Sequence, residues 1–271
     1  MTNGGRGVPR RQVAWAFLRR DLRVALSYRF PFFLQVLAIA FTVVTFAFVA
    51  ELVPPGEVPG GYFTFAITGI IVASFLTAAT TTLGGSLQEE QSRGTLEAVI
   101  ASGVPVAGLA IGFAAFPIVN AAVSSVAYVL VAALIGWDAV ASANWSLAGV
   151  ALLLGTISFA GVGFVGAALV LVFRRAGAVT GWLVALALFL GGELFPPSLL
   201  PGWLQAISWL SPFTLTLSLI RDALLEQRAW GESWGALAGV SVAAIAYVTL
   251  GLVALAAGLR HAKRVGTLGG Y

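Results

Sequence analysis

Six long apolar stretches dominate the sequence and restrict the folds that it can adopt. A helix that crosses a bilayer needs about 20 mostly apolar residues. Hydrophobic residues make up 59% of the chain and charged residues 10%, whereas soluble domains carry about 25% charged residues. The sequence therefore predicts an all-α membrane protein with six transmembrane helices and no separate soluble domain. The expected spans are 30–52, 62–87, 104–137, 145–173, 177–192, which is short for a full crossing, and 235–259.

Positive charges fall almost entirely on one side of these spans. Thirteen of the 15 Lys and Arg residues precede the first span, separate the second from the third or the fourth from the fifth, or follow the sixth. Cytoplasmic segments carry the excess of Lys and Arg, so both termini are expected in the cytoplasm. This predicts a tail with an interfacial helix over 1–29, a transmembrane domain over 30–259 and a cytoplasmic tail over 260–271.

Residues 11–29 carry too many charges to belong to the first span. At the roughly 100° per residue of an α-helix, Arg19, Arg20 and Arg23 fall on one arc, and mainly aromatic and aliphatic residues cover the rest. This segregation is typical of an amphipathic helix that lies in the membrane interface. The alternative, that these arginines only set the topology, accounts for their charge but not for their position on one arc.

The cytoplasmic segment 88–103, between the second and third spans, has three carboxylates and one arginine on a side that is otherwise positive. Gly94 interrupts the helical pattern, and Thr95 can cap a new helix that carries Glu97 in its first turn. Pro105 then follows, before the third span. These local signals predict a short cytoplasmic helix and, by themselves, no particular partner.

Residues 193–222, between the fifth and sixth spans, are too apolar for an exposed loop and too rich in proline for a span. Non-helical backbone at membrane depth is tolerated only where protein buries it or where it lines a water-filled cavity. A re-entrant hairpin that enters from the outside meets this condition. Trp203, Trp209 and Trp230 suit the aromatic belt at the membrane interface. We therefore expect an extracellular re-entrant hairpin between spans five and six.

Both segments resemble type-2 ATP-binding-cassette exporter permeases. Residues 90–97, Glu-Gln-Ser-Arg-Gly-Thr-Leu-Glu, resemble that family's E-x-x-x-G-T-L-E motif. The outer segment resembles the family's F-P-x-x-x-L-P-x-W-L pattern, which is followed by a proline, a hydrophobic residue, a threonine and an arginine. The matching residues, in order, are Phe195-Pro196, Leu200-Pro201, Trp203-Leu204, Pro212-Phe213-Thr214 and Arg221.

The resemblance implies a role for each segment. The inner segment would be a coupling helix that docks in a cleft of a cytoplasmic ATPase subunit, through Glu90, Arg93, Gly94, Thr95, Leu96 and Glu97. The interfacial helix would supply a second contact, through Arg19, Arg20 and Arg23. The outer hairpin would form an outer gate that includes Glu193, Phe195, Pro196, Pro201, Trp203 and Pro212.

A few polar residues and glycines in or beside the spans are open to two interpretations. Asn120 and Ser124 can line a substrate pathway, or they can form hydrogen bonds between helices, which is the commoner use. An ionisable residue near the membrane is by default a candidate for a functional role. Glu193 is either such a residue or an interfacial carboxylate at a helix end. Glycine pairs four residues apart allow close helix contact, and such pairs include Gly108/Gly112, Gly177/Gly181 and Gly235/Gly239.

Residue counts exclude several kinds of site. The chain has no cysteine and one histidine, His261, which excludes disulfides, thiolate metal sites and histidine metal clusters. A P-loop needs Gly-Lys followed by Ser or Thr, and the single lysine, Lys263, lies between Ala262 and Arg264. The chain therefore cannot hydrolyse ATP alone. We expect no catalytic residue, metal or cofactor on it, and expect ATP with Mg²⁺ on a partner subunit.

The resemblance implies the permease subunit of an ATP-driven exporter. Its partners would be a cytoplasmic ATPase, a second permease copy that is identical or homologous, and membrane lipid, with no nucleic acid. The chain has fourteen arginines and one lysine, which indicates a GC-rich bacterial genome. We therefore expect a multi-pass protein of a bacterial cytoplasmic membrane.

The few charges in the spans favour a hydrophobic or amphipathic substrate, such as a drug-like molecule or a lipid. A lipid-linked glycan or a polysaccharide is the alternative. Two other functional classes fit the sequence less well. An ion-coupled secondary transporter would need a relay of ionisable groups within the membrane, and a membrane lipid enzyme would have only Glu193, Asp222 and Glu226 as outer candidates.

Overall fold

The computed structural model describes residues 29–54, 56–58, 60–92, 106–137, 143–173, 177–226 and 228–265. These residues form helices and turns, with no strand among them, and the prediction of an all-α membrane protein is confirmed. Three short helices lie between α8 and α11, namely η1 (Pro197–Leu199), α9 (Gly202–Ser208) and α10 (Pro212–Leu224). The longer helices are α2 (Arg29–Leu52), α3 (Tyr62–Ser92), α5 (Val106–Leu134), α7 (Trp145–Phe173), α8 (Gly177–Gly191) and α11 (Trp230–Val265).

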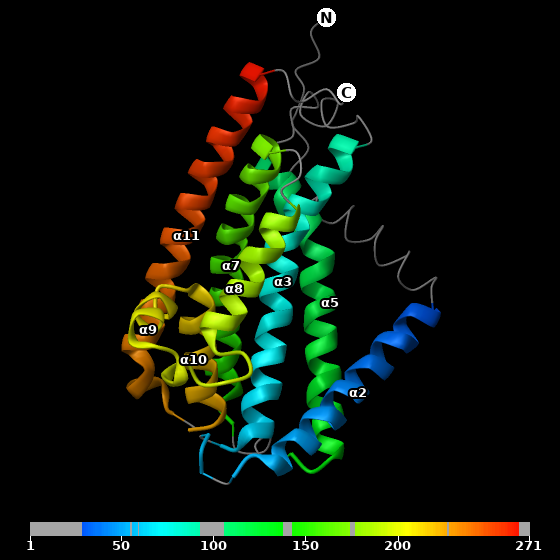
Figure 1. Ribbon diagram of the computed structural model, residues 1–271, viewed down its shortest axis with the longest axis vertical. Helices are drawn as coiled ribbons and strands as arrows, with labels where there is room; N and C mark the ends of the chain where they lie inside the picture. The colour runs from blue at the N-terminus through cyan, green and yellow to red at the C-terminus, as the bar shows by residue number, and fades with distance from the viewer. Residues whose placement is uncertain are drawn as a thin grey trace, which may run out of the picture.

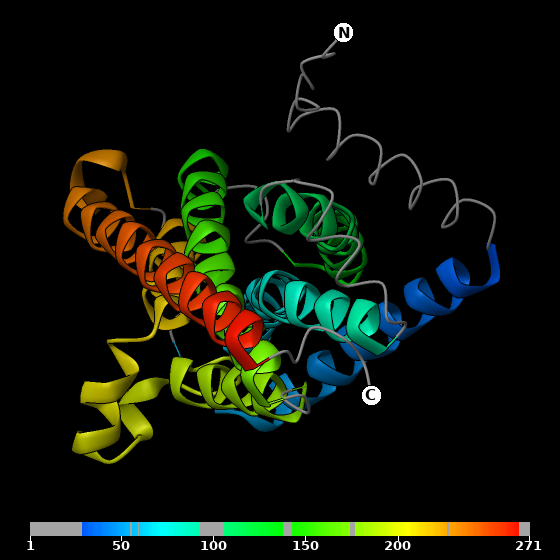
Figure 2. The same cartoon turned by 90° about the horizontal axis from the view of Figure 1, so that it is seen from above.

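The helices form one elongated bundle (Figure 1). α3, α5, α7, α8 and α11 run along its length, and α2 lies obliquely beside α5 and α3. η1, α9 and α10 lie toward one end of the bundle, which we call the hairpin end. Figure 2 shows the same arrangement from above, with α2 and α9 on opposite sides of the bundle. α3 begins at the hairpin end and ends at the opposite end.

The long helices are suited to a membrane. Among the described residues, five helices are long and apolar enough to cross one, namely α2, α3, α5, α7 and α11. α8 has 15 residues, fewer than the roughly 20 that a spanning helix needs. α9 and α10 meet at a bend of 85°, so this apolar segment does not form a straight span. Phe41, Leu130 and Val242 are 74%, 60% and 67% exposed, as expected for a lipid-facing surface of a multi-pass membrane protein.

α7 is the central helix of the bundle and packs against α3, α10 and α11. Two of its glycines bring backbones into direct contact. A Cβ atom at Gly161 would lie 2.4 Å from the carbonyl oxygen of Tyr247 on α11, and one at Gly163 would lie 2.5 Å from that of Ala79 on α3. Because no side chain fits into these gaps, glycine at both positions is a condition for the packing of three helices.

The helix bounds show where the expected spans and the structure differ. α7 has the bounds expected for the fourth span, whereas α3 continues beyond 87 to Ser92 and α11 begins at Trp230 and reaches Val265. The apolar run marks the part of a helix that lies in lipid, and the helix itself can continue beyond it. α3 and α11 both extend past the ends of their apolar runs. Glu90 lies in the last turn of α3. The other predicted coupling and interfacial residues lie outside the described residues: Arg19, Arg20, Arg23, Arg93, Gly94, Thr95, Leu96 and Glu97.

Candidate functional site

Between α8 and α11 the chain forms a compact hairpin, residues 192–225, whose turns contain glycine and proline. Gly192 has a φ of +75°, a conformation that favours glycine, and it turns the chain after α8. Pro197 and Pro212 occupy the first positions of η1 and α10, where the missing N–H group costs nothing. Pro201 directly precedes α9. The prolines that argue against a straight span therefore mark the helix starts of the hairpin.

Side-chain hydrogen bonds hold the hairpin together. Gln205 Nε2 donates to the carbonyl oxygens of Ser198, at 3.0 Å, and Leu200, at 2.8 Å. Ser208 Oγ donates to the carbonyl oxygen of Leu190 at 2.7 Å. The first pair of bonds closes the loop between η1 and α9, and the last bond ties the end of α9 to α8. The hairpin is thus a structured element with its own internal contacts.

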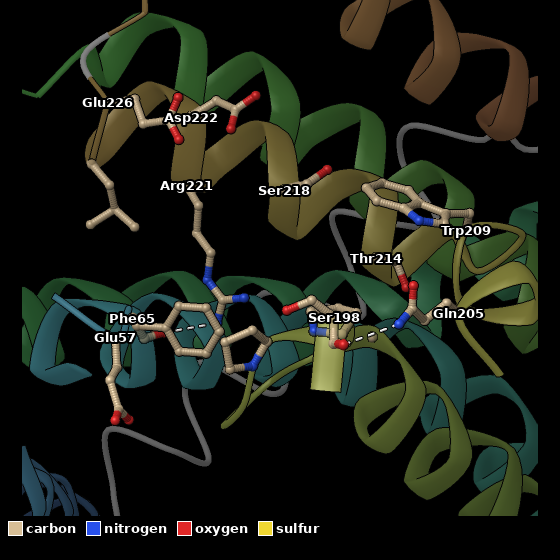
Figure 3. Close-up of a pocket in the computed structure, with 14 residues that line it drawn as sticks. Glu57, Phe65, Ser198, Gln205, Trp209, Thr214, Ser218, Arg221, Asp222 and Glu226 are labelled. Carbon is tan, nitrogen blue, oxygen red and sulfur yellow. Dashed lines mark hydrogen bonds between the residues drawn. The ribbon is translucent and has the colours of Figure 1, made fainter. Parts of the chain in front are cut away.

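Arg221 on α10 ties the start of the hairpin to α3. Its side chain extends from α10 toward α3 (Figure 3) and is 9% exposed. Nη1 donates to the carbonyl oxygen of Gly192 at 2.8 Å. Nη2 donates to the carbonyl oxygens of Phe65, at 2.9 Å, and Glu193, at 3.0 Å. The guanidinium carbon lies 3.3 Å from the centroid of the Phe65 ring.

These contacts explain how a charged group can be buried there. Burial of a charge is costly unless the charge is paired or hydrogen-bonded. A hydrogen bond to a charged group contributes about 1.5–3 kcal/mol, and an aromatic face contributes about 0.5–2 kcal/mol. Arg221 Nε, however, finds no hydrogen-bond partner among the described residues. The guanidinium is therefore firmly held, with one donor left unsatisfied.

Gly69 provides the space for this arrangement on α3. A Cβ atom at position 69 would lie 2.1 Å from the carbonyl oxygen of Glu193 and 3.1 Å from Arg221 Nη2. The turn after α8 can approach α3 this closely only because position 69 has no side chain. We call this group of residues the Arg221 contact; it consists of Phe65, Gly69, Gly192, Glu193 and Arg221.

A cavity of about 390 Å³ lies beside the Arg221 contact, between the hairpin and α3 (Figure 3). Its volume lies within the range of about 300–1,000 Å³ that is usual for small-molecule sites. Phe65 and Arg221 form part of its wall, and Gln205 and Trp209 line it from the hairpin. Three acidic residues, Glu57, Asp222 and Glu226, are also among the residues that line it. The cavity therefore combines aromatic and charged groups.

Arg228 balances two of these carboxylates. Its Nη1 lies 3.1 Å from Asp222 Oδ2, and its Nη2 lies 2.7 Å from Glu226 Oε2. The Asp222 charge, with the Glu226 carboxylate, raises the pKa of Arg228, so this side chain stays charged at all physiological pH values. Arg228 is 43% exposed, and solvent screens exposed ion pairs so that they contribute little to stability. The group therefore sets the charge of the cavity more than the stability of the fold.

The predicted outer-gate residues lie in different parts of the hairpin. Pro196 lines the cavity, Phe195 packs edge-on against a ring of α8, and Trp203 is 68% exposed. Pro201 and Pro212 stand at the helix starts described above. Glu193 contributes its main-chain carbonyl oxygen to the Arg221 contact. A gating role for these residues stays a prediction.

Asn120 and Ser124 of α5 face Gln35 of α2. Gln35 Nε2 donates to Ser124 Oγ at 2.7 Å and lies 3.5 Å from Asn120 Oδ1. Ser124 Oγ also donates to the carbonyl oxygen of Asn120 at 2.8 Å. The three side chains form a polar link between two helices, and they are not among the residues that line the cavity.

Replacement of Gln35 by Leu should therefore cost little stability and leave transport unchanged. Hydrogen bonds between membrane helices contribute about 0.6 kcal/mol on average. Thermal unfolding in detergent measures the loss. Thr45→Val is the matched control, because in the described part of the chain Thr45 Oγ1 donates within its own helix, to the carbonyl oxygen of Phe41. Loss of transport without loss of stability would instead favour a pathway role for Asn120 and Ser124.

The sequence patterns do not assign a site role to Arg221, Gln35 or Gly69, although the structure places all three in contacts between helices. Arg221 matches the outer motif, and its signal as a site residue is a lone arginine inside an apolar segment on the side poor in positive charge. Gln35 has a similar signal, a lone amide inside an apolar span. Gly69 has none, because the chain contains 32 glycines and their spacing does not show which one meets a carbonyl group.

Comparison with known proteins places these features in a family. The sequence matches the ABC-2 type transporter family over residues 12–225. It is also similar to Nodulation protein J of Sinorhizobium fredii (strain NBRC 101917 / NGR234), with 28% identity over 65% of this chain and 67% of the relative. Nodulation protein J of Rhizobium meliloti (strain 1021) is 26% identical over 63% of this chain and 65% of the relative. Because the family match covers most of the chain and includes residues 90–97 and the hairpin, this chain belongs to the ABC-2 type transporter family.

Proposed function

We propose that this chain is the permease subunit of an exporter that is driven by a separate ATPase. The observation that carries the proposal is the course of α3. This one helix takes part in the Arg221 contact near its start and bears Glu90 in its last turn. An ABC-2 membrane domain is a component of a transporter and is not itself catalytic. The structure thus supports a permease in which one helix connects an ATPase-facing loop to an outer hairpin.

We place the hairpin end outside the cell and the opposite end in the cytoplasm. Arg260 and Arg264 lie near the end of α11 that is remote from the hairpin, whereas Arg221 and Arg228 lie at the hairpin end. Together with the thirteen-to-two division of positive charge in the sequence, this favours a cytoplasmic location for both termini. The membrane would be a bacterial cytoplasmic membrane.

The ATPase would bind at the cytoplasmic end, around Glu90 and residues 93–97. The basic face of the interfacial helix, with Arg19, Arg20 and Arg23, would supply a second contact. ATP and Mg²⁺ would be held by the ATPase, because the single lysine of this chain excludes a P-loop. A second permease copy, identical or homologous, would complete the pathway in the lipid bilayer.

The substrate that we infer is hydrophobic or amphipathic, such as a drug-like molecule or a lipid. Two cavities of different character flank α10 and support this inference. The cavity of about 390 Å³ is lined by Gln205 and Asp222, whereas an apolar groove of about 410 Å³ between α3, α5, α7 and α10 is lined by Ile220 and Leu224. Polar and apolar parts of one molecule would each find a matching surface near the hairpin end.

A lipid-linked glycan or a polysaccharide is the second candidate substrate. The observation that favours it is the combination of Trp209 with the acidic residues Glu57, Asp222 and Glu226 in the lining of the cavity of about 390 Å³. Carboxylates accept hydrogen bonds from hydroxyl groups, and an aromatic ring offers an apolar face to a sugar ring. Stimulation of ATP hydrolysis by candidate substrates, measured on the reconstituted complex, distinguishes the two classes.

Replacement of Glu90 by Arg should abolish stable association with the ATPase, because it reverses a charge at the proposed docking site. Co-purification of the tagged chain with the ATPase from an adjacent reading frame, one that contains GxxxxGK[ST], is the measurement. Glu57→Arg is the matched control, since Glu57 is an exposed carboxylate at the hairpin end. If Glu90→Arg and Gly94→Pro both retain the complex and its ATP turnover, the coupling assignment is wrong.

A further inference from the structure

α3 connects the two ends of the molecule as a single element. Phe65 lies in its first turn and Glu90 in its last, and the residues between them span about 38 Å at a rise of about 1.5 Å per residue. α3 packs against α5, α7, α8 and α10 along its course, and Val72 and Leu76 in its middle are buried. A continuous helix of this kind would carry a displacement of one end to the other.

The Arg221 contact is where the hairpin receives that displacement. One guanidinium donates both to α3, at the carbonyl oxygen of Phe65, and to the turn after α8, at those of Gly192 and Glu193. The planar fork of an arginine can bind acceptors on two sides at once, whereas a lysine ammonium is a point charge on a flexible stem. Gly69 brings the same two segments into direct contact from the α3 side.

One donor of the Arg221 contact is left for a different set of hydrogen bonds. Arg221 Nε is buried without a hydrogen-bond partner among the described residues, and Arg221 lines the cavity. Movement of the turn after α8 away from α3 would break bonds to Nη1 and Nη2 but would allow Nε to reach an acceptor in the cavity. If every N–H group of the guanidinium were already bonded, no new hydrogen bond from Nε could offset the loss of the bonds from Nη1 and Nη2.

We propose that Arg221 is a positioning residue that couples α3 to the turn after α8, so that movement of α3 driven by the ATPase repositions the outer hairpin. This inference rests on the proposed function and adds a specific path to it. Arg221 does not act on the substrate. It acts through the main-chain carbonyl groups of Phe65, Gly192 and Glu193, which no side-chain substitution at those positions removes.

The test measures the hairpin directly and needs no substrate. The chain contains no cysteine, so spin labels can be placed at Ser198→Cys on η1 and Glu232→Cys on α11, both exposed positions. The labelled chain is reconstituted with its ATPase in liposomes of phosphatidylethanolamine and phosphatidylglycerol. We expect the distance between the labels to change on addition of ATP and vanadate, and Arg221→Lys to abolish this change while basal ATP hydrolysis stays within twofold.

Matched controls separate coupling from general damage. Arg228→Lys alters a half-exposed arginine of the same region and should preserve the distance change. Gly69→Ala should reduce the change as Arg221→Lys does, whereas Gly181→Ala, at a position with open space around it, should not. If Arg221→Lys is not recovered from membranes, Gly69→Ala against Gly181→Ala decides the question.

The outcomes for the two proposals are distinguishable. A wild-type chain that binds no ATPase overturns the proposed function, and the inference falls with it. A wild-type complex that hydrolyses ATP without any change in the label distance overturns the inference alone. So does a distance change that persists in Arg221→Lys or, where that variant is not recovered, in Gly69→Ala.

Discussion

Replacement of Arg221 by Leu should destabilise the protein by about 3 kcal/mol, the value of one to two hydrogen bonds to a charged group. The variant loses three bonds to main-chain carbonyl oxygens and the contact with the Phe65 ring. Leucine restores part of the lost packing, which keeps the effect below the sum of these contributions. Thermal unfolding in detergent and limited proteolysis within residues 192–225 measure it.

Arg228→Leu is the control for this prediction. Arg228 forms two ion pairs, but it is 43% exposed, and solvent screens exposed pairs so that they contribute little to stability. We therefore expect a small shift in the unfolding temperature and an unchanged pattern of proteolysis. If Arg221→Leu and Arg228→Leu lower the unfolding temperature equally, the buried hydrogen bonds of Arg221 to main-chain carbonyl groups are not what stabilises the hairpin.

Gly161→Val should have an effect at least as large, by separating α7 from α11. Even a Cβ atom at this position would lie 2.4 Å from the carbonyl oxygen of Tyr247, which belongs to the backbone and cannot turn away. Overpacking of a core costs about 1–3 kcal/mol, and more where the backbone has to move. We expect roughly 3 kcal/mol or more, seen as a low yield of folded protein and a lower unfolding temperature.

Gly149→Val on the same helix is the comparison for Gly161→Val. A Cβ atom at Gly149 meets nothing within 4 Å in the described part of the chain, and valine replaces glycine in a helix in both variants. The difference between the two unfolding temperatures therefore isolates the contact between helices. Similar losses for both variants would show that helix propensity, and not the approach of two backbones, causes the destabilisation.

The helices of the bundle were predictable because their length and apolar character are imposed by the bilayer. α7 has the bounds expected from the apolar run, and the short fifth run became the short helix α8. The end of α3 was not predictable in this way. Its last residues, Gln88 to Ser92, are polar but remain helical, because helix formation depends on the backbone and the apolar pattern reports only the neighbouring lipid.

The Arg221 contact was harder to predict because its acceptors are main-chain carbonyl groups. A pair of oppositely charged side chains leaves two signals in a sequence, whereas Arg221 and the carbonyl oxygens of Gly192, Glu193 and Phe65 leave only one. Glu193 shows the consequence. In the sequence its carboxylate is the functional candidate, whereas in the structure its main-chain carbonyl oxygen accepts the hydrogen bond from Arg221.

Glycine spacing was equally uninformative about helix contacts. Gly235 and Gly239 form a small-x-x-x-small pair, yet Cβ atoms there would meet nothing within 4 Å in the described part of this chain. Close contacts with a neighbouring backbone are made instead by glycines such as Gly161 and Gly163, which are two residues apart. In a three-dimensional bundle each glycine of α7 can serve a different neighbour, α11 or α3, so no single repeat describes them.

The polar link of α2 has a consequence for the order in which the protein is assembled during synthesis. Gln35 bonds to side chains that lie 85 and 89 residues later in the chain. Before these partners are synthesised, the apolar surface of α2, which includes the exposed side chains of Phe41 and Phe48, is the part of this helix that favours the bilayer. The polar link between α2 and α5 can therefore form only after the chain has been synthesised as far as Asn120 and Ser124, close to half of its length.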